Sequence, residues 1–198
     1  MRYLLGVDEA GRGPLAGPVA VGVVAALEGY DFFAAFPGLN DSKKLSEKKR
    51  EALYELLLEE GKKGNVRAKV CFSSERVIDE KGIAYAIRDA LARGVHALSP
   101  ESTDVHIYLD GALKAPDGYS QETIIGGDGS VPAIMLASVA AKVARDRRMV
   151  ALAEEYPAYD FATHKGYGTK AHIERIRLNG LSPLHRRSFC RNVMSATT

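Results

Sequence analysis

The sequence contains little cysteine and no hydrophobic run long enough to cross a membrane. Its two cysteines, Cys71 and Cys190, are far apart and form no metal-ligand pattern, so a reducing cytoplasm is the simpler interpretation. Before Asp8 there is one basic residue and only a short apolar run, which is unlike a secretory signal peptide. These absences argue against a membrane or secreted protein, and we expect a cytoplasmic one without a membrane partner.

Net charge is also small, at +2, but it is unevenly distributed along the chain. Residues 1–141 contain 16 lysines and arginines against 20 acids, whereas residues 142–198 contain 11 against 5. A basic carboxyl-terminal part suits an acidic partner such as nucleic acid, although a solvated surface helix has the same composition. Charge alone therefore leaves both interpretations open.

The hydrophobic pattern predicts one α/β domain with a mixed sheet. At 198 residues the chain is long enough to bury a sizeable core, and it contains no internal repeat, low-complexity tract or obvious linker. Strands are expected over residues 2–7, 18–26, 66–72, 104–109 and 121–125. Helices are expected over residues 46–60, 74–98 with a break near Gly82, 132–154 and 170–179.

Two local features constrain how these elements pack. The loop between the first two strands is short, which favours an antiparallel pair. In the long helix, Ala137, Ala140, Ala141 and Ala144 recur at helical spacing. A face of small residues allows close approach, so we expect this helix to pack directly on the sheet.

Four acids share one local setting. Asp8 and Asp110 each end an apolar strand before a glycine-containing turn, Glu9 follows Asp8, and Asp128 lies in the turn GGDGS. A buried acid needs a partner, a proton or a metal, and oxygen ligands at strand ends suit Mg²⁺ or Mn²⁺. Two such ions, about 4 Å apart, clamp the attacking and leaving oxygens of phosphodiester cleavage. Because neighbouring side chains alternate between faces, Asp8 and Glu9 can share a site only where the strand twists or ends.

The glycine-rich segment AGRGPLAG follows these first two acids. It lacks the GK[ST] end of a Walker A loop, and its glycine spacing is not G-x-G-x-x-G. Gly11 and Gly13 would let the backbone approach a sugar–phosphate, with Arg12 supplying a cation. An ordinary turn is the alternative.

Two further segments carry candidate nucleic-acid contacts. Lys43 and Lys44 precede the expected helix cap Ser46, where they either reach a phosphate or belong to a solvated charge run. Tyr167 lies between two glycines on an expected loop, where it either stacks on a base or sugar or covers the edge of the core.

The segments GVDEAGRGPLAGPV, NDSKKLSEKKR, YLDG, GGDGS with ASVAAKVARDR, HKGYGT and LSPLHRRSF occur in that order, from residue 6 to residue 189. Together they closely resemble bacterial ribonuclease HII. The resemblance implies a ribonuclease H-like fold, with a central mixed β-sheet flanked by helices. It also implies that residues 1–198 form a single catalytic domain with a C-terminal helical extension from about residue 168.

The resemblance implies an endonuclease that cleaves the RNA strand of RNA–DNA hybrids. It also implies incision at single ribonucleotides embedded in duplex DNA, leaving 3′-hydroxyl and 5′-phosphate ends. Its partners would therefore be these two kinds of duplex, and we expect it to act as a monomer. Two ions, Mn²⁺ or Mg²⁺, would serve the catalytic complex.

The family motifs assign roles to particular residues of this sequence. Metal-binding acids match Asp8, Glu9, Asp110 and Asp128; the GRG motif at the sugar–phosphate matches Gly11, Arg12 and Gly13; the tyrosine at the RNA–DNA junction matches Tyr167; and the basic motif near the scissile phosphate matches Lys43 and Lys44. In a two-metal mechanism, Asp8 and Asp110 would share the ions, while Glu9 and Asp128 would each complete one.

Alternatives remain at the level of the residue and of the protein class. Asp146 competes with Asp128 for the fourth acid role, but its arginine neighbours in a helix favour a surface ion pair. A junction resolvase, a hybrid-only ribonuclease, a hybrid-binding module without catalysis and a nucleotide-phosphate enzyme are the other functions considered. The missing Walker lysine argues against the last of these.

Overall fold

The computed structural model describes residues 2–99, 101 and 103–195. One five-stranded sheet has the order β3-β2-β1-β4-β5. β1 is antiparallel to β2 and parallel to β4, β2 is antiparallel to β3, and β4 is parallel to β5, so the sheet is mixed as expected. The strands are β1 (Tyr3–Ala10), β2 (Val19–Leu27), β3 (Val66–Ser73), β4 (Val105–Asp110) and β5 (Ser120–Ile124).

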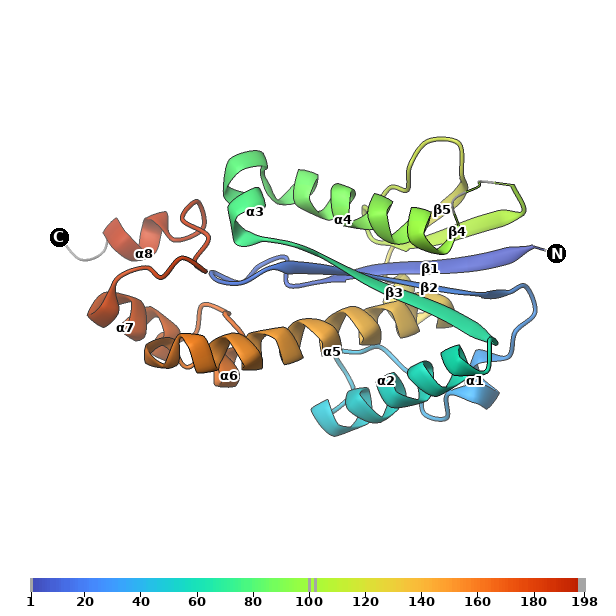
Figure 1. Ribbon diagram of the computed structural model, residues 1–198, viewed down its shortest axis with the longest axis horizontal. Coiled ribbons are helices and arrows are strands. Elements are labelled where there is room, and N and C mark those ends of the chain that lie inside the picture. The colour runs from blue at the N-terminus through green and yellow to red at the C-terminus, as the bar shows by residue number, and fades with distance from the viewer. Residues whose placement is uncertain (1, 100, 102, 196–198) are drawn as a thin grey trace.

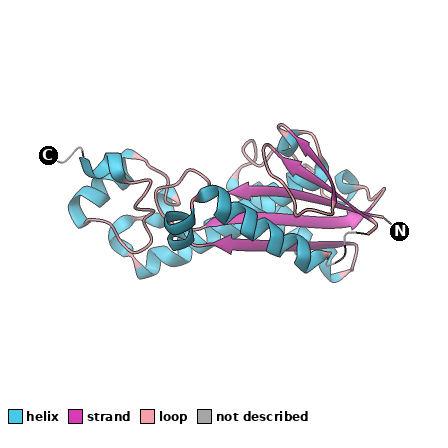
Figure 2. Ribbon diagram, turned by 90° about the horizontal axis from the view of Figure 1, so that it is seen from above, coloured by secondary structure: helices cyan, strands magenta, loops and turns pink. Residues whose placement is uncertain are grey.

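Helices cover both faces of this sheet and extend past one end of it. In Figure 1, α3 and α4 lie on one face, while α5, α1 and α2 lie on the other. Figure 2 shows the carboxyl-terminal helices beyond the ends of the strands, as expected for a helical extension. The helices are α1 (Phe32–Ala35), α2 (Glu47–Lys62), α3 (Glu75–Lys81), α4 (Ile83–Leu98), α5 (Pro132–Glu155), α6 (Phe161–His164), α7 (Lys170–Asn179) and α8 (Arg191–Ser195).

Helix boundaries follow the local signals in the sequence. The side chain of Ser46 accepts a hydrogen bond from the Lys49 amide at the start of α2, and Thr169 caps α7 in the same way. Gly82, at a φ of 85°, separates α3 from α4, which confirms the expected break. A further short helix, α1, lies within residues 30–45, where the sequence pattern predicted none.

α5 packs against the sheet at two glycines. A Cβ atom on Gly6 would lie 2.1 Å from the carbonyl carbon of Ala133, and one on Gly22 would lie 2.2 Å from the oxygen of Ala137. Only glycine therefore fits at these positions of β1 and β2. The expected close contact between a small-residue helix face and the sheet is confirmed, and it fixes α5 relative to the end of β1.

The buried side chains form separate clusters on the two faces of the sheet. Leu5, Val7 and Val21 contact the α4 side, whereas Val24 and Leu136 belong to the cluster on the α5 side. A third cluster joins the end of α5 to the extension and contains Ala16, Met149, Leu152, Tyr159, Phe161 and Leu184. The extension is therefore packed against α5 and the loop after β1 through its own apolar core.

Burial limits one open alternative and corrects one expectation about charged residues. The basic carboxyl-terminal part is not a uniformly solvated surface, because Arg145 and Arg186 are fully buried. Asp146 is buried as well, and its carboxylate pairs with Lys142 at 2.7 Å rather than with a neighbouring arginine at the surface. No helix of the described residues is sufficiently long and apolar to span a bilayer; the expected cytoplasmic location stays a prediction.

Candidate active site

Asp8 and Asp110 lie side by side because of the register between their strands. Parallel pairing of β1 with β4 ends at Val7 and Leu109, so the next residues, Asp8 and Asp110, follow at the same level of the sheet. β1 itself continues to Ala10 along β2, where Asp8 pairs with Gly22. The expectation that β1 ends before Asp8 was therefore wrong: the strand continues on one side and is open on the other.

Asp128 completes a compact cluster with these two acids. It lies in a short 3-10 helix (Gly127–Gly129), and its backbone amide donates to Asp110 Oδ1 at 3.3 Å. Asp8, Asp110 and Asp128 each offer one carboxylate oxygen, and these oxygens lie within 4.8 Å of one another. Asp146 is not part of this group, so the geometry favours Asp128 as the acid at this site.

The cluster is electrostatically strained without a cation. Asp8 is only 5% exposed, and burial, together with the charges of Glu9 and Asp110, raises its pKa to about 7 against hydrogen bonds from Ser138 and the Glu9 amide. Nζ of Lys43 donates to Asp128 Oδ2 at 2.7 Å, and this hydrogen bond raises the pKa of Lys43. Three close carboxylate oxygens, one of which belongs to a carboxylate that already binds the ammonium of Lys43, form a site that suits a hard divalent ion.

Glu9 occupies the edge of the site rather than its centre. Its carboxylate accepts a hydrogen bond from Arg12 Nη1 at 3.0 Å and does not belong to the group of three acids. Both Asp8 and Glu9 nevertheless line one cavity of about 420 Å³. Because β4 no longer pairs with β1 at this level, the cavity reaches both faces of the strand, which answers how alternating side chains share it.

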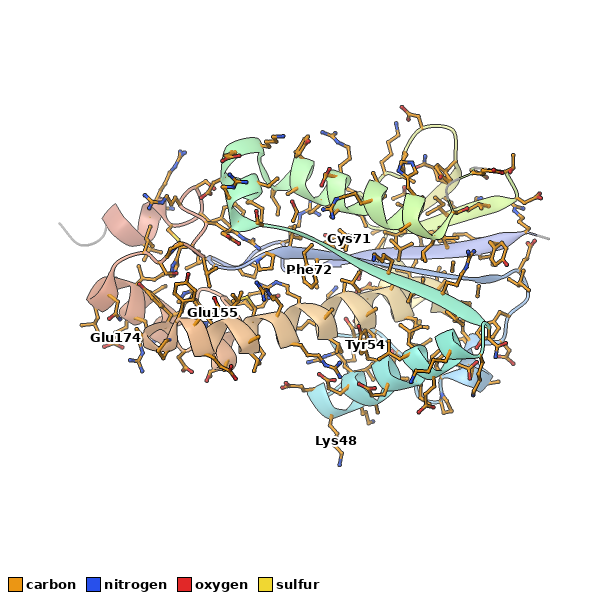
Figure 3. All side chains as sticks on the ribbon, in the orientation of Figure 1. Lys48, Tyr54, Cys71, Phe72, Glu155 and Glu174 are labelled. Atoms are coloured by element: carbon orange, nitrogen blue, oxygen red, sulfur yellow. The ribbon has the colours of Figure 1, made fainter. Side chains whose placement is uncertain are left out.

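Most of the other candidate residues surround the same cavity. Gly11, Arg12, Gly13, Lys43 and Tyr167 line it, together with Ser42, Arg50, Ser138 and Lys142. Lys44 does not, and its Nζ lies 3.7 Å from Asp41. Lys48 and Lys49 are exposed, and Lys48 points away from α2 in Figure 3, whereas Arg50 donates to the backbone oxygens of Ser42 and Leu45. The structure thus separates two adjacent lysines that the sequence could not.

Ser138 and Lys142 were missed by reading the sequence. They lie one helical turn apart in α5, a helix otherwise rich in alanine and valine. Two polar residues at this spacing on such a helix indicate a shared face that meets a polar site. The Ser138 hydroxyl is 2.8 Å from that of Ser42, which joins α5 to the segment carrying Lys43. Lys142 Nζ lies 5.8 Å from the centre of the Tyr167 ring and pairs with Asp146 at 2.7 Å, so it joins the tyrosine to α5 at the cavity wall.

The two glycines of GRG have different surroundings. A Cβ atom on Gly11 would lie 1.9 Å from Nε of Arg145, whereas one on Gly13 would have nothing within 4 Å. Arg145 donates from Nε to the Pro18 oxygen at 2.9 Å, and its guanidinium lies 5.6 Å from the centre of the Tyr167 ring. Gly11 therefore makes room for a buried arginine, and only Gly13 leaves open space for a ligand.

Together, these features define a class of protein. A mixed sheet ends in a cluster of carboxylates suited to divalent metal, beside a cavity lined by arginine, lysine and an aromatic ring. Such an arrangement is that of a metal-dependent phosphodiester hydrolase with a ribonuclease H-like fold.

Comparison with known sequences narrows the class to one family. The family model described as ribonuclease HII matches residues 5–192. Ribonuclease HII of Endomicrobium trichonymphae is 45% identical over 186 residues, covering 93% of this chain and 83% of that protein. Ribonuclease HII of Bacillus cereus (strain AH820) is 45% identical over 194 residues, covering 96% and 69%. The chain belongs to the ribonuclease HII family.

Solved structures agree with this fold. The chain is similar to ribonuclease HII of Archaeoglobus fulgidus, solved as a complex with PCNA, with a TM-score of 0.74, 26% identity and 96% of each chain covered. Ribonuclease H2 of Pyrococcus horikoshii OT3 gives a TM-score of 0.73 at 23% identity, with 98% of each chain covered. As a member of its family, the chain is a metal-dependent nuclease that cleaves the RNA strand of RNA–DNA hybrids.

Proposed function

We propose that this enzyme also incises duplex DNA at single embedded ribonucleotides, using two Mg²⁺ or Mn²⁺ ions. One observation carries the proposal: Asp8 and Asp110 line the same cavity as Gly13 and Tyr167. Because the groups that would read a sugar lie directly beside those that would hold metal, one ribonucleotide is enough to occupy both.

The three clustered acids, together with Glu9 at the edge of the site, would hold the metal ions. Asp8 and Asp110 would be shared between the two sites, with Asp128 completing one and Glu9 the other. When bound, such ions lower the pKa of water and stabilise the leaving 3′-oxygen. The water would give up a proton, its oxygen would bond to phosphorus as the bond to O3′ breaks, and the departing O3′ would take up a proton, which leaves 3′-hydroxyl and 5′-phosphate ends.

The remaining residues would position the substrate. Lys43 is bound to Asp128, yet its side chain is 76% exposed, so it can turn to the scissile phosphate once metal neutralises that carboxylate. Tyr167, which is 40% exposed, presents its ring to a base or sugar. The GRG backbone, which lines the cavity, would lie next to the sugar, where the 2′-hydroxyl distinguishes RNA from DNA.

The chain would act as a monomer in this reaction. Asp8, Asp110, Gly13 and Tyr167, the residues that would hold metal and read the sugar, already meet in one cavity within a single chain, which supports this proposal. Sedimentation at assay concentrations measures this, and a stable dimer would contradict it.

The test is an end-labelled DNA duplex containing one ribonucleotide, incubated with Mg²⁺ or Mn²⁺. We expect a single cut beside the ribonucleotide, with 3′-hydroxyl and 5′-phosphate ends, and no cut with Asp8→Asn. Asp117→Asn is the matched control, because that aspartate is 93% exposed in its side chain and lies outside the cluster. An intact duplex with both metals would contradict the proposal.

Other outcomes identify the alternatives. Cleavage of a long RNA–DNA hybrid with an intact single-ribonucleotide duplex would indicate a hybrid-only ribonuclease. Salt-sensitive binding without cleavage of either duplex would indicate a binding module. Cleavage of an all-DNA junction would indicate a resolvase.

A further inference from the structure

A short segment of the carboxyl-terminal extension is paired with the loop that follows GRG. The Gly17 amide donates to the Leu184 oxygen at 2.8 Å, and the Arg186 amide donates to the Leu15 oxygen at 2.8 Å. His185 lies between these two bonds, in an antiparallel bridge with Ala16. The pairing places the side chains of His185 and Arg186, which are 2% and 0% exposed, beneath the proposed substrate-reading loops.

Arg186 is bonded to backbone oxygens of the GRG loop rather than to an acid. Its guanidinium donates to the oxygens of Gly11 at 2.7 Å, Arg12 at 3.0 Å and Gly17 at 2.9 Å. No carboxylate among the described residues forms an ion pair with it. Burial lowers the pKa of Arg186 to about 9, assisted by the charge of Arg145, so it stays a cation at neutral pH.

These bonds set the direction of two backbone amides. In a trans peptide the C=O and the following N–H point in opposite directions. Holding the oxygens of Gly11 and Arg12 against Arg186 therefore turns the N–H groups of Arg12 and Gly13 away from it. Neither N–H has a hydrogen-bond partner within the described chain, and both residues line the acidic cavity. Two consecutive free amides of this kind bind anions and other acceptors.

His185 acts on Tyr167, the second proposed substrate-reading residue, through His172. Its Nδ1 accepts from the Ser182 amide at 2.9 Å, so its proton lies on Nε2 and is donated to His172 Nε2 at 3.1 Å. The proton of His172 then lies on Nδ1 and is donated to the backbone oxygen of Tyr167 at 2.9 Å. Only this pair of neutral tautomers satisfies all three bonds. The backbone of Tyr167 is thus held from the same segment as GRG.

We propose that His185 and Arg186 are positioning residues that hold the GRG amides and Tyr167 in fixed relation, and that they thereby determine selectivity for a ribonucleotide. This role rests on the proposed incision at single ribonucleotides. Neither residue touches substrate or metal; each acts on a loop that does. Selectivity depends on them because a 2′-hydroxyl and a neighbouring phosphate are read correctly only when both loops keep their spacing.

Arg186→Lys tests the first half of the proposal. Lysine keeps the charge, but one ammonium cannot bond three divergent oxygens in the geometry of the guanidinium fork. We expect KM for the single-ribonucleotide duplex to rise about tenfold or more, with the binding preference over all-DNA duplex shrinking in parallel. The increase in Tm on adding Mn²⁺ should stay that of the unmodified protein. Arg187→Lys, at an exposed neighbour, is the matched control.

His185→Asn and His185→Gln test the second half. The asparagine amide can still meet the Ser182 backbone but cannot reach His172, whereas the longer glutamine amide can donate to His172. We expect the selectivity to be lost in His185→Asn and largely recovered in His185→Gln. A merely structural role would lower Tm in both variants and leave the ratio of ribonucleotide to all-DNA binding unchanged, which would overturn the proposal.

A measurement on the unmodified chain covers the case in which these variants do not fold. Amide hydrogen exchange is followed by NMR in EDTA, with and without the single-ribonucleotide duplex. We expect the amides of Arg12 and Gly13 to exchange freely in the protein without duplex. Their exchange should be slower by about tenfold or more in the complex with the single-ribonucleotide duplex, and should slow less with all-DNA duplex. Gly29, in an exposed turn at the other end of β2, is the internal control. Protection before binding, or no change on binding, would overturn the proposal.

Failure of this inference is distinguishable from failure of the proposed function. If the unmodified protein leaves the single-ribonucleotide duplex intact, the proposed function fails. If it cuts that duplex while folded Arg186→Lys retains the KM and preference of Arg187→Lys, only the positioning role fails.

Discussion

Gly11 and Gly13 lie two residues apart in one loop, and at the scale of the residue they have different reasons to be glycine. Gly11 has a φ of 88° and faces the buried guanidinium of Arg145. Gly13 faces open space, because a Cβ atom added there would meet no other atom of the described chain within 4 Å. The first glycine is required by the folded protein itself, whereas the second leaves space that the proposed substrate would fill.

Alanine at each position separates these two reasons. Gly11→Ala should lower the free energy of unfolding by about 2–4 kcal/mol, because the methyl group meets Arg145 and the φ is strained. Gly13→Ala should change it by less than about 1 kcal/mol yet lower cleavage of the single-ribonucleotide duplex. Urea unfolding and initial rates measure the two effects. Equal loss of stability in both variants would contradict this account.

At the scale of the element, α5 carries the site because it can approach the sheet closely. Its residues Ser138 and Lys142 reach the cavity only because Gly6 and Gly22 allow the helix backbone to contact β1 and β2. This contact places polar side chains of a largely buried helix beside the acids of a strand end. The same packing explains why α5 contributes to the site although its sequence contains none of the three clustered acids.

Gly22→Ala tests this packing. The added methyl group would lie 2.2 Å from the Ala137 oxygen, a backbone atom that cannot move alone. We expect the free energy of unfolding to fall by about 3 kcal/mol or more, measured by urea unfolding. Gly61→Ala, in α2, is the control, because its Cβ would lie 3.6 Å from the nearest atom, the backbone oxygen of Val66, which is an ordinary contact distance. A similar effect of both substitutions would show that the helix–sheet contact is not tight.

The histidine pair that links α7 to the segment carrying His185 should make stability depend on pH. Burial lowers the pKa of His172 and of His185 to about 4, and each ring also faces the other, with His164 stacked 4.2 Å from His172. The unfolded chain binds protons near pH 6.5 while the folded chain stays neutral, so stability is full above that pH and is lost as pH falls toward 4.

Urea unfolding at pH 7 and pH 5 measures this dependence. Each histidine should contribute a loss of about 2 kcal/mol over that interval by proton linkage. His172→Gln removes one titrating ring, so its loss between the two pH values should be smaller by about that amount. An unchanged pH dependence in this variant would contradict burial of the neutral pair.

At the scale of the whole molecule, the positive charge is divided between two tasks. Arg145 and Arg186 are buried and bond backbone oxygens, whereas Lys43 and Arg12 are exposed at the cavity. Exposed cations release counterions when they meet nucleic-acid phosphates, and buried ones do not. The excess of basic residues in the carboxyl-terminal part therefore overstates how many of them meet the duplex.

Salt dependence of duplex binding measures that division. With Mg²⁺ at a fixed concentration and an all-DNA duplex, which should not be cut, the affinity should fall as KCl rises, and Lys43→Ala should reduce the slope of log affinity against log salt by about 1. Lys44→Ala, at the neighbouring lysine that pairs with Asp41, should change the slope less. Fluorescence anisotropy measures both variants. Equal slopes would show that the structure does not distinguish the two lysines.

The sequence predicted the order of the major elements, the antiparallel first pair and the small-residue face of α5, because these depend on local periodicity and turns. It did not predict that β1 continues past Asp8. The length of this strand depends on its pairing with β2, which continues to Ala10, and not on its pairing with β4, which ends at Val7. Nor could the sequence place Arg186 under GRG, because 169 residues separate its side chain from the Gly17 oxygen that it binds. Burial of Asp146 was missed for the same reason: it depends on tertiary packing.

The central claim, selectivity for a ribonucleotide beside a divalent-metal site, is tested most directly by two duplexes that differ in one 2′-hydroxyl group. Single-turnover cleavage is measured on both with saturating enzyme and Mg²⁺ or Mn²⁺. The account predicts rapid cutting at the ribonucleotide and no detectable cutting of the all-DNA duplex. Equal cleavage of both duplexes, or of neither, would contradict it.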